Sequence, residues 1–299
     1  MMEHPVIETQ QLSKNFGRIA AVRELNIKVQ PGQVFGILGP NGSGKTTTLG
    51  MLAGVVNPSS GGFKWFGENG SKDNRKKVGI ILERPNFYPY MSAYKNLQIV
   101  SAIKGVSDKN RIDEVLKKVD LFDRRNDRFK TFSLGMKQRL SIASALLADP
   151  KVLILDEPTN GLDPQGISEI RNLIKNIASE GKTIILASHL LNEVQKVCSH
   201  FMILKSGKLM HLGPVSGNEV EHKVEVAASD MASLKQALTD LPFVKDIVQD
   251  DGVLTAEIEA NKNGHDINEA LFAKGIVASH LVQKTINLEQ KFLEILAQP

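Results

Sequence analysis

The first two thirds of the chain contain short apolar runs in which polar residues do not alternate. VFGIL (34–38), VLIL (152–155) and the run inside KTIILASHLL (182–191) show this pattern clearly. An unbroken apolar run predicts a strand that is buried on both faces of a sheet. Such strands, separated by helical patterns, predict an α/β fold.

Apolar residues three or four positions apart predict helices between these strands. Ser133 is the predicted N-cap of one helix, whose apolar positions are Met136, Leu140, Ala143 and Leu147. Residues 87–131 form a charge-rich helical insertion that places on one face Ile112, Val115, Leu116 and Val119. We expect a helical arm over residues 87–148.

The pattern changes at VSGNEVEH (215–222), which we interpret as a linker between two domains, 1–216 and 217–299. The second domain shows strand and helix patterns in the order βαββαβ, and Asn287 with Gln290 predicts the start of a final amphipathic helix. This order is typical of a small ferredoxin-like α+β domain. We expect this second domain to support dimer formation, to regulate the protein, or only to add stability.

Composition narrows the class of protein. Hydrophobic residues make up 41% of the 299 residues and charged residues 23%, as in ordinary soluble domains, and the net charge of +4 demands no acidic partner. Cys198 is the only cysteine, which excludes an intrachain disulfide and favours a reducing, cytosolic compartment. Neither a signal peptide nor a membrane-spanning stretch is predicted, so we expect a membrane process to be reached only through a partner.

The apolar run 34–38 leads into GPNGSGKTTTLGML, which fits G-x-x-x-x-G-K-[ST] between a predicted strand and a predicted helix. Small residues let successive backbone N–H groups surround phosphate oxygens at the positive end of the helix. Lys45 can reach the β- and γ-phosphates, and the Thr46 hydroxyl can bind Mg²⁺. The predicted phosphate-binding residues are Gly39, Pro40, Asn41, Gly42, Ser43, Gly44, Lys45, Thr46 and Thr47. The alternative is a glycine-rich turn without a ligand.

The apolar run 152–155 ends in two adjacent carboxylates, Asp156 and Glu157. Unpaired charges are costly beside a buried strand, so a counterion is expected there. In phosphate-binding sheets Mg²⁺ lies near the carboxyl ends of neighbouring strands, where Asp156 would hold the metal and Glu157 would act as general base towards water. The alternative, that both side chains cap the following turn, explains one acid better than two.

Residues 1 to about 215 resemble the ATP-binding subunit of ABC transporters. The resemblance implies a P-loop core with an antiparallel β subdomain and a helical arm. The resemblance implies that Phe16 stacks on adenine, although taken alone Phe16 would more often be a core residue. It also implies that His189, at the end of the strand in 182–191, contacts the γ-phosphate and fixes Glu157 and the water. The other histidines have no metal-ligand spacing.

FSLGMKQRLSIASALLADP (132–150) is similar to the signature segment of this family. Phe132, Leu134 and Met136 depart from the usual L-S-G-G-Q, whereas Ser133 and Gly135 remain. The resemblance implies that Ser133 and Gly135 contact the γ-phosphate held by an opposing subunit, and that Asp163 in TNGLDP lies near the partner's site. Locally, an ordinary capped helix is also plausible.

Glu83 stands where the family usually has Gln, which would place a third carboxylate near Mg²⁺ unless Glu83 faces solvent and pairs with Arg84. Glu83, PNFYP and SLGMKQR together resemble the subfamily that exports bacitracin and lantibiotics. The aromatic residues Phe87, Tyr88 and Tyr90 would contact a membrane subunit or pack on the arm.

The resemblance implies an ATPase that forms a dimer around two MgATP and drives a separate membrane permease for export, from the cytoplasmic face of the cell membrane. It implies no nucleic-acid partner. The rival class is a soluble ABC ATPase associated with ribosomes or DNA.

Overall fold

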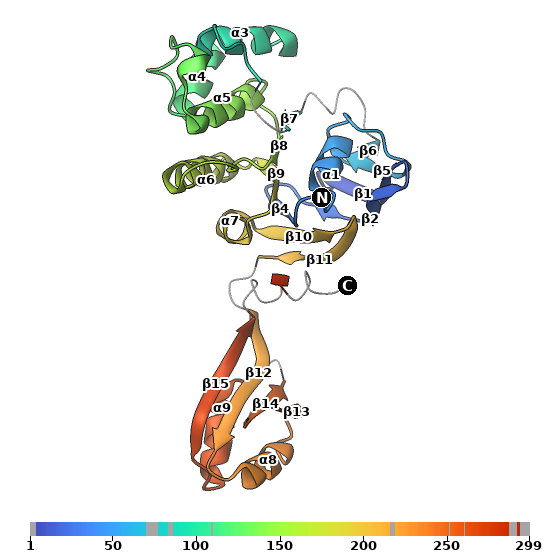
Figure 1. Cartoon of the computed structure of the whole chain (residues 1–299), viewed down its shortest axis with the longest axis vertical. Helices are drawn as coiled ribbons and strands as arrows, with labels where there is room; N and C mark the ends of the chain where they lie inside the picture. The colour runs from blue at the N-terminus through green and yellow to red at the C-terminus, as the bar shows by residue number, and fades with distance from the viewer. Residues whose placement is uncertain are drawn as a thin grey trace. The chain divides into compact units, whose positions relative to one another are not determined.

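The computed structural model describes residues 4–69, 77–82, 86–108, 110–215, 219–250, 252–259, 261–286 and 292–293. The chain forms two compact units, Met1–Val215 and Ser216–Pro299 (Figure 1). Each unit has its own sheet and its own buried core.

The first unit is built on a six-stranded sheet in the order β11-β10-β4-β9-β8-β7. Its strands are β4 (Val34–Leu38), β7 (Val78–Ile81), β8 (Val152–Asp156), β9 (Thr183–Ser188), β10 (His200–Lys205) and β11 (Lys208–Pro214). All pairings are parallel except that of β10 with β11. Every residue of β4, β8 and β9 is buried, which confirms the prediction from the unbroken apolar runs.

A second, antiparallel sheet packs beside the first. Its strands are β1 (Ile7–Phe16), β2 (Ile19–Leu25), β3 (Lys28–Val29), β5 (Ser60–Trp65) and β6 (Glu68–Asn69), in the order β2-β1-β5-β6 with β3 paired to β1. The hairpin of β1 and β2 has irregular register between Leu12 and Asn15. The antiparallel subdomain implied by the resemblance is therefore present.

Helices cover both faces of the central sheet: α1 (Lys45–Leu52) lies on the side of the antiparallel sheet, and α6 (Pro164–Ser179) and α7 (Leu191–Val197) lie on the other (Figure 1). The arm contains α3 (Ala93–Lys104), α4 (Asn110–Lys118), a 3₁₀ turn (Phe129–Thr131) and α5 (Leu134–Leu146). Ile112, Val115 and Leu116 are buried in α4, as their spacing predicted. Ser133 is the N-cap of α5, and its hydroxyl accepts a hydrogen bond from Met136 N at 3.2 Å, which confirms the predicted cap.

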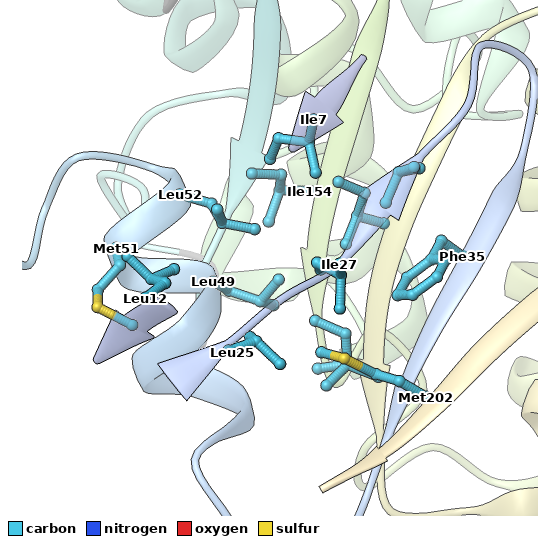
Figure 2. Packing of buried hydrophobic residues seen from close by; sticks show 14 of the residues in the cluster. Ile7, Leu12, Leu25, Ile27, Phe35, Leu49, Met51, Leu52, Ile154 and Met202 are labelled. Carbon is cyan, nitrogen blue, oxygen red and sulfur yellow. The ribbon is translucent and has the colours of Figure 1, made fainter. Parts of the chain in front are cut away.

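The core of the first unit joins the two sheets to α1. Figure 2 shows side chains from β1, β2, β4, β8 and β10 in one cluster with Leu49, Met51 and Leu52 of α1. Burial of this apolar surface holds α1, and with it the loop that precedes α1, between the two sheets.

The second unit has the element order βαββαβ. Its elements are β12 (Glu219–Ala228), α8 (Met231–Thr239), β13 (Val244–Asp250), β14 (Val253–Ile258), α9 (Gly264–Ala273) and β15 (Ala278–Ile286). The strands form an antiparallel sheet in the order β13-β14-β12-β15. Val224, Val226 and Leu254 point to one face, where they pack with apolar residues of α8 and α9.

The final helix predicted from Asn287 lies outside the described residues, except for helical residues 292 and 293. Within the ranges that the structure describes, no helix is both long enough and apolar enough to cross a bilayer.

Candidate active site

The loop between β4 and α1 has the backbone of a phosphate cradle. Gly42 and Gly44 have φ of +79° and +107°, in the left-handed region that favours glycine, and Gly44 is the N-cap of α1. A Cβ on Gly39 would lie 2.3 Å from Leu204 O, and one on Gly44 would lie 2.3 Å from Ala21 O. Both positions therefore require glycine, because neighbouring backbone occupies the space of any side chain.

Two polar groups of this loop suit an anionic ligand. The Ser43 hydroxyl is buried, and no residue in the described part of the chain forms a hydrogen bond with it. A buried hydroxyl without a partner is destabilising, and a phosphate oxygen in the loop would supply an acceptor. The Lys45 side chain is only 6% exposed, and its ammonium donates to Gly39 O at 2.8 Å and to Pro40 O at 3.2 Å. The residues present therefore fit a bound phosphate group.

Glu157 lies between a lysine and a histidine. Its Oε1 is 3.4 Å from Lys45 Nζ, and its Oε2 is 2.8 Å from His189 Nδ1. Its backbone is left-handed, with φ of +46°, which is uncommon for a residue other than glycine. Its N–H donates to Ala187 O at 3.0 Å, which ties this conformation to β9. Strained backbone of this kind is typical of functional sites.

The sheet topology explains why these residues meet. Leu38 pairs with Ser188, and Asp156 pairs with Ala187, so β4, β8 and β9 end at the same edge of the sheet. The residues that follow each strand are therefore neighbours, although they lie far apart in the sequence.

Asp156 and Thr46 are the residues available for a hard cation. Asp156 is buried at the end of β8, and Thr46 lies in the first turn of α1. Among the described residues, no three His, Cys, Asp or Glu side chains gather as metal ligands. Mg²⁺ needs only one or two protein ligands and takes the rest from water and phosphates. Glu83, the third predicted ligand, lies outside the described residues.

The predicted trans-acting residues lie together at the start of two helices. Ser133 caps α5, and Asp163 caps α6 by accepting from Gly166 N at 2.9 Å. A Cβ on Gly161 would lie 3.3 Å from Leu134 Cδ2, so the 159–164 loop contacts the signature segment. Among described residues, no hydrogen bond joins Ser133 or Asp163 to the phosphate loop of the same chain.

Phe16 and the loop before α3 expose aromatic rings. Phe16 is 51% exposed at the end of β1, so it is not a core residue. Tyr88 and Tyr90 are also exposed, whereas Phe87 packs edge-on against Phe129 of the arm at 5.2 Å. The two interpretations of this loop therefore apply to different residues: Phe87 packs on the arm, and the tyrosines remain available for contact.

Sequence reasoning missed Asn96, which fixes this aromatic loop. Asn96 is buried in α3, and its amide bonds to Tyr88 N, Tyr88 O and Ser92 O at 2.9, 3.1 and 3.0 Å. No local pattern marks Asn96 as special, because its partners become neighbours only when the loop folds over the helix.

Comparison with known proteins places these motifs in one family. A family model described as ABC transporter matches residues 22–160. The bacitracin transport ATP-binding protein BcrA of Bacillus licheniformis is 38% identical over 298 residues, which cover 97% of each chain. This chain belongs to the ATP-binding subunits of ABC transporters. The lantibiotic transport ATP-binding protein SrtF of Streptococcus pyogenes is 40% identical over 214 residues, covering 72% of this ABC subunit and 93% of its own length.

A solved structure agrees with the family and the fold. A dimeric ATP-binding cassette in a post-hydrolysis state, bound to ADP and Pi, is 25% identical, has a TM-score of 0.62, and covers 71% of this chain and 99% of its own. The predicted ABC-type α/β ATPase fold, and an ATPase activity coupled to transport, are thereby confirmed. The relatives BcrA and SrtF are named for transport, so the ribosome- or DNA-associated alternative has no support.

Proposed function

We propose that two copies of this ABC subunit pair around two MgATP and that each active site is shared between them. The observation that carries ATP hydrolysis at these sites is the position of Glu157 between Lys45 and His189 beside the phosphate loop. The Ser133 and Asp163 segments, which share no hydrogen bond with that loop among the described residues, would complete the partner's site. The dimeric solved relative supports this arrangement.

The geometry suggests that Lys45 binds phosphate and that Glu157 accepts a proton from water. The Lys45 ammonium forms an ion pair with Glu157 and donates hydrogen bonds to two loop carbonyls. Phosphate oxygens compete for that ammonium, and as Lys45 turns to them it releases a carboxylate oxygen of Glu157. Glu157 can then accept a proton from water, while His189 keeps the carboxylate in place. Mg²⁺, held by Thr46 and Asp156, would neutralise charge on the phosphates.

A mixing experiment tests the shared site. Lys45→Ala disables the phosphate loop of one chain, and Ser133→Ala disables the segment that it offers to a partner. Mixed dimers contain one site with both defects and one site with neither, so we expect mixing the two inactive variants to restore ATPase activity. If each active site were confined to one chain, no activity would return.

Crosslinking offers an independent test of the same arrangement. Cys198 is buried, and burial raises the pKa of its thiol, so it is unreactive. A Ser133→Cys variant therefore carries one reactive thiol in the described part of the chain. A thiol-reactive ATP analogue bound to one subunit should label Cys at position 133 of the other subunit and not of its own.

We propose a membrane permease as the second partner, on the cytoplasmic face of the cell membrane, and export as the direction of transport. Tyr88, whose backbone is bonded to Asn96, and Tyr90 are both exposed, which suits a contact with a short permease helix. Full-length similarity to BcrA favours a peptide antibiotic of the bacitracin type as the transported class. Purification from detergent-solubilised membranes should recover a polytopic subunit, which Tyr88→Ala with Tyr90→Ala should release. Recovery of ribosomes or DNA instead would contradict this proposal.

Glu83 remains a predicted ligand of the metal. A Glu83→Gln variant should keep ATP binding but change the Mg²⁺ dependence of hydrolysis or its coupling to transport. Unchanged Mg²⁺ titrations and unchanged transport would remove Glu83 from the metal site.

We propose that residues 1–216 are the ATP-binding domain and residues 217–299 a ferredoxin-like accessory domain. The strand order β13-β14-β12-β15, with both helices on one face, supports this assignment. Removal of the accessory domain should leave ATP binding intact, and a loss of dimer formation would assign it a role in pairing.

A further inference from the structure

The turn between β10 and β11 contacts two parts of the site that are distant in sequence. Its central residues are both left-handed, Ser206 with φ of +48° and Gly207 with φ of +78°, as in a tight hairpin. Gly207 N donates to Ser43 O of the phosphate loop at 3.0 Å, and Arg23 N of β2 donates to Gly207 O at 2.8 Å. A single residue is therefore bonded to the phosphate loop on one side and to β2 on the other.

The packing at Gly207 leaves no space for a side chain. A Cβ there would lie 2.8 Å from Ala21 O and 2.9 Å from Ala20 O, which are backbone atoms and cannot rotate away. Gly44 of the phosphate loop approaches the same strand, since its Cβ would lie 2.3 Å from Ala21 O. The backbone of Ala20 and Ala21 is thus held between one glycine of the turn and one glycine of the phosphate loop.

This stretch of β2 also fixes the hairpin that carries Phe16. Ala20 pairs with Asn15, and Ile19 pairs with Phe16, across β1 and β2. The turn therefore sets the spacing between the ring of Phe16 and the phosphate loop. A nucleotide whose adenine stacks on Phe16 while its phosphates occupy the loop needs that spacing to be correct.

We propose that Gly207 is a positioning residue of the nucleotide site and that it controls the base-dependent part of ATP affinity through Phe16. The proposal rests on the nucleotide-binding function proposed above and on the stacking of adenine on Phe16 that the family resemblance implies. A Cβ at position 207 collides with β2, so the displacement falls on the Phe16 hairpin, whereas the backbone bond to Ser43 O involves no side chain and can persist.

A double-mutant cycle on the full-length subunit tests this coupling. Loss of base stacking corresponds to about 5–150-fold in affinity, which sets the upper limit for any effect through Phe16. We expect Gly207→Ala to weaken ATP binding by about fivefold or more. Because it acts through Phe16, it should cause no further loss in a Phe16→Ala background. Inorganic tripolyphosphate, which has no base, should bind to Gly207→Ala as it binds to the unchanged protein.

Gly181→Ala is the matched control. Gly181 has φ of +83°, close to that of Gly207, but no atom lies within 4 Å of its Cβ position. The two variants therefore share the backbone strain and differ in the collision with β2. We expect both variants to lose melting temperature, Gly207→Ala the more because of its collision with β2, and ATP binding to weaken in Gly207→Ala only.

A second variant covers the case in which Gly207→Ala does not fold. Ser206→Val puts a β-branched residue at an exposed, left-handed position, which strains the turn without adding a Cβ at Gly207. It should give a smaller loss of ATP affinity that again vanishes in Phe16→Ala. Additive losses in the cycle, weakened tripolyphosphate binding, or equal ATP affinities in the Gly207 and Gly181 variants would overturn the proposal. Failure of the unchanged protein to bind ATP would instead contradict the proposed function.

Discussion

Each unit of this ABC subunit contains a glutamate that contacts a lysine and a histidine. In the first unit Glu157 lies 3.4 Å from Lys45 and 2.8 Å from His189. In the second unit Glu225 lies 2.7 Å from Lys284 and 3.8 Å from His280. The residue types are the same, so the different roles that we propose for them must come from where the backbone places them.

The Glu157 group lies where parallel strands end, beside a loop of left-handed glycines, and Lys45 is only 6% exposed. The Glu225 group lies in the middle of antiparallel strands on an open sheet face, where Lys284 is 42% exposed. There the Lys284 side chain lowers the pKa of Glu225 below its ordinary value, as in an ordinary surface ion pair. The comparison teaches that parallel strands create sites because their loops converge at one edge, whereas an antiparallel sheet face only pairs charges.

The largest expected effect follows from replacing each of the two glutamates by glutamine. Glu157→Gln should reduce ATP turnover about 10²–10⁴-fold, because the amide cannot accept a proton from water, while ATP binding persists. Glu225→Gln, the matched change in the second unit, should leave turnover unchanged. Turnover and nucleotide affinity of both purified variants would be measured side by side. Near-normal hydrolysis by Glu157→Gln would contradict its role as base.

The two lysines, Lys45 and Lys284, should differ in their effect on nucleotide affinity. Lys45→Ala should weaken ATP binding about 10–150-fold, the value of a lost hydrogen bond to a charged group. Lys284→Ala should have no effect on nucleotide affinity, because its ammonium contacts Glu225. Equilibrium titration with a fluorescent nucleotide checks both variants, and equal affinities would remove Lys45 from the phosphate site.

Core substitutions test whether the units depend on each other. Ile154→Ala, between the two sheets of the first unit, should cost about 2–5 kcal/mol of unfolding free energy and lower ATP turnover through the distorted site. Val226→Ala, in the core of the second unit, should destabilise that unit alone and spare turnover. Scanning calorimetry would resolve the two unfolding transitions. A drop in turnover with Val226→Ala would show that the accessory domain supports the active site.

The smallest effects belong to surface ion pairs. The hydrogen bond from Lys182 lowers the pKa of Asp149 below its ordinary 3.8, and that from Lys274 lowers the pKa of Asp240 likewise. Because the folded pKa values are lowered, this stabilisation is present above pH 3.8 and is lost as the pH falls through the folded pKa.

Asp149→Asn should therefore lower the stability of the first unit by a few tenths of a kcal/mol at neutral pH, measured by urea unfolding, and the difference should disappear in acid. Asp240→Asn should change the stability of the second unit in the same direction, and that difference should also disappear in acid. A large loss of stability from either change would mean that the ion pair also stabilises the packing beneath it.

Much of the first unit was predictable because its determinants are local. The unbroken runs 34–38 and 152–155 are buried strands, as their pattern predicted, and the hydroxyl of Ser133 caps the helix that begins next to it. The phosphate loop is also local, since glycine at positions 42 and 44 permits the backbone that surrounds an anion. The sequence therefore determined the strands, the loop and the nucleotide class by itself.

Only the tertiary structure decided how these pieces act on one another. The contact of Glu157 with Lys45 depends on the register of parallel strands separated by more than a hundred residues. Gly207 packs against the backbone of β2, and Asn96 bonds to the backbone of Tyr88. Neither contact follows from the spacing of residues in the sequence. A sequence pattern predicts which face of each segment is buried. The distances between loops depend instead on how whole sheets pack, because that packing minimises the exposed apolar surface of the entire core at once.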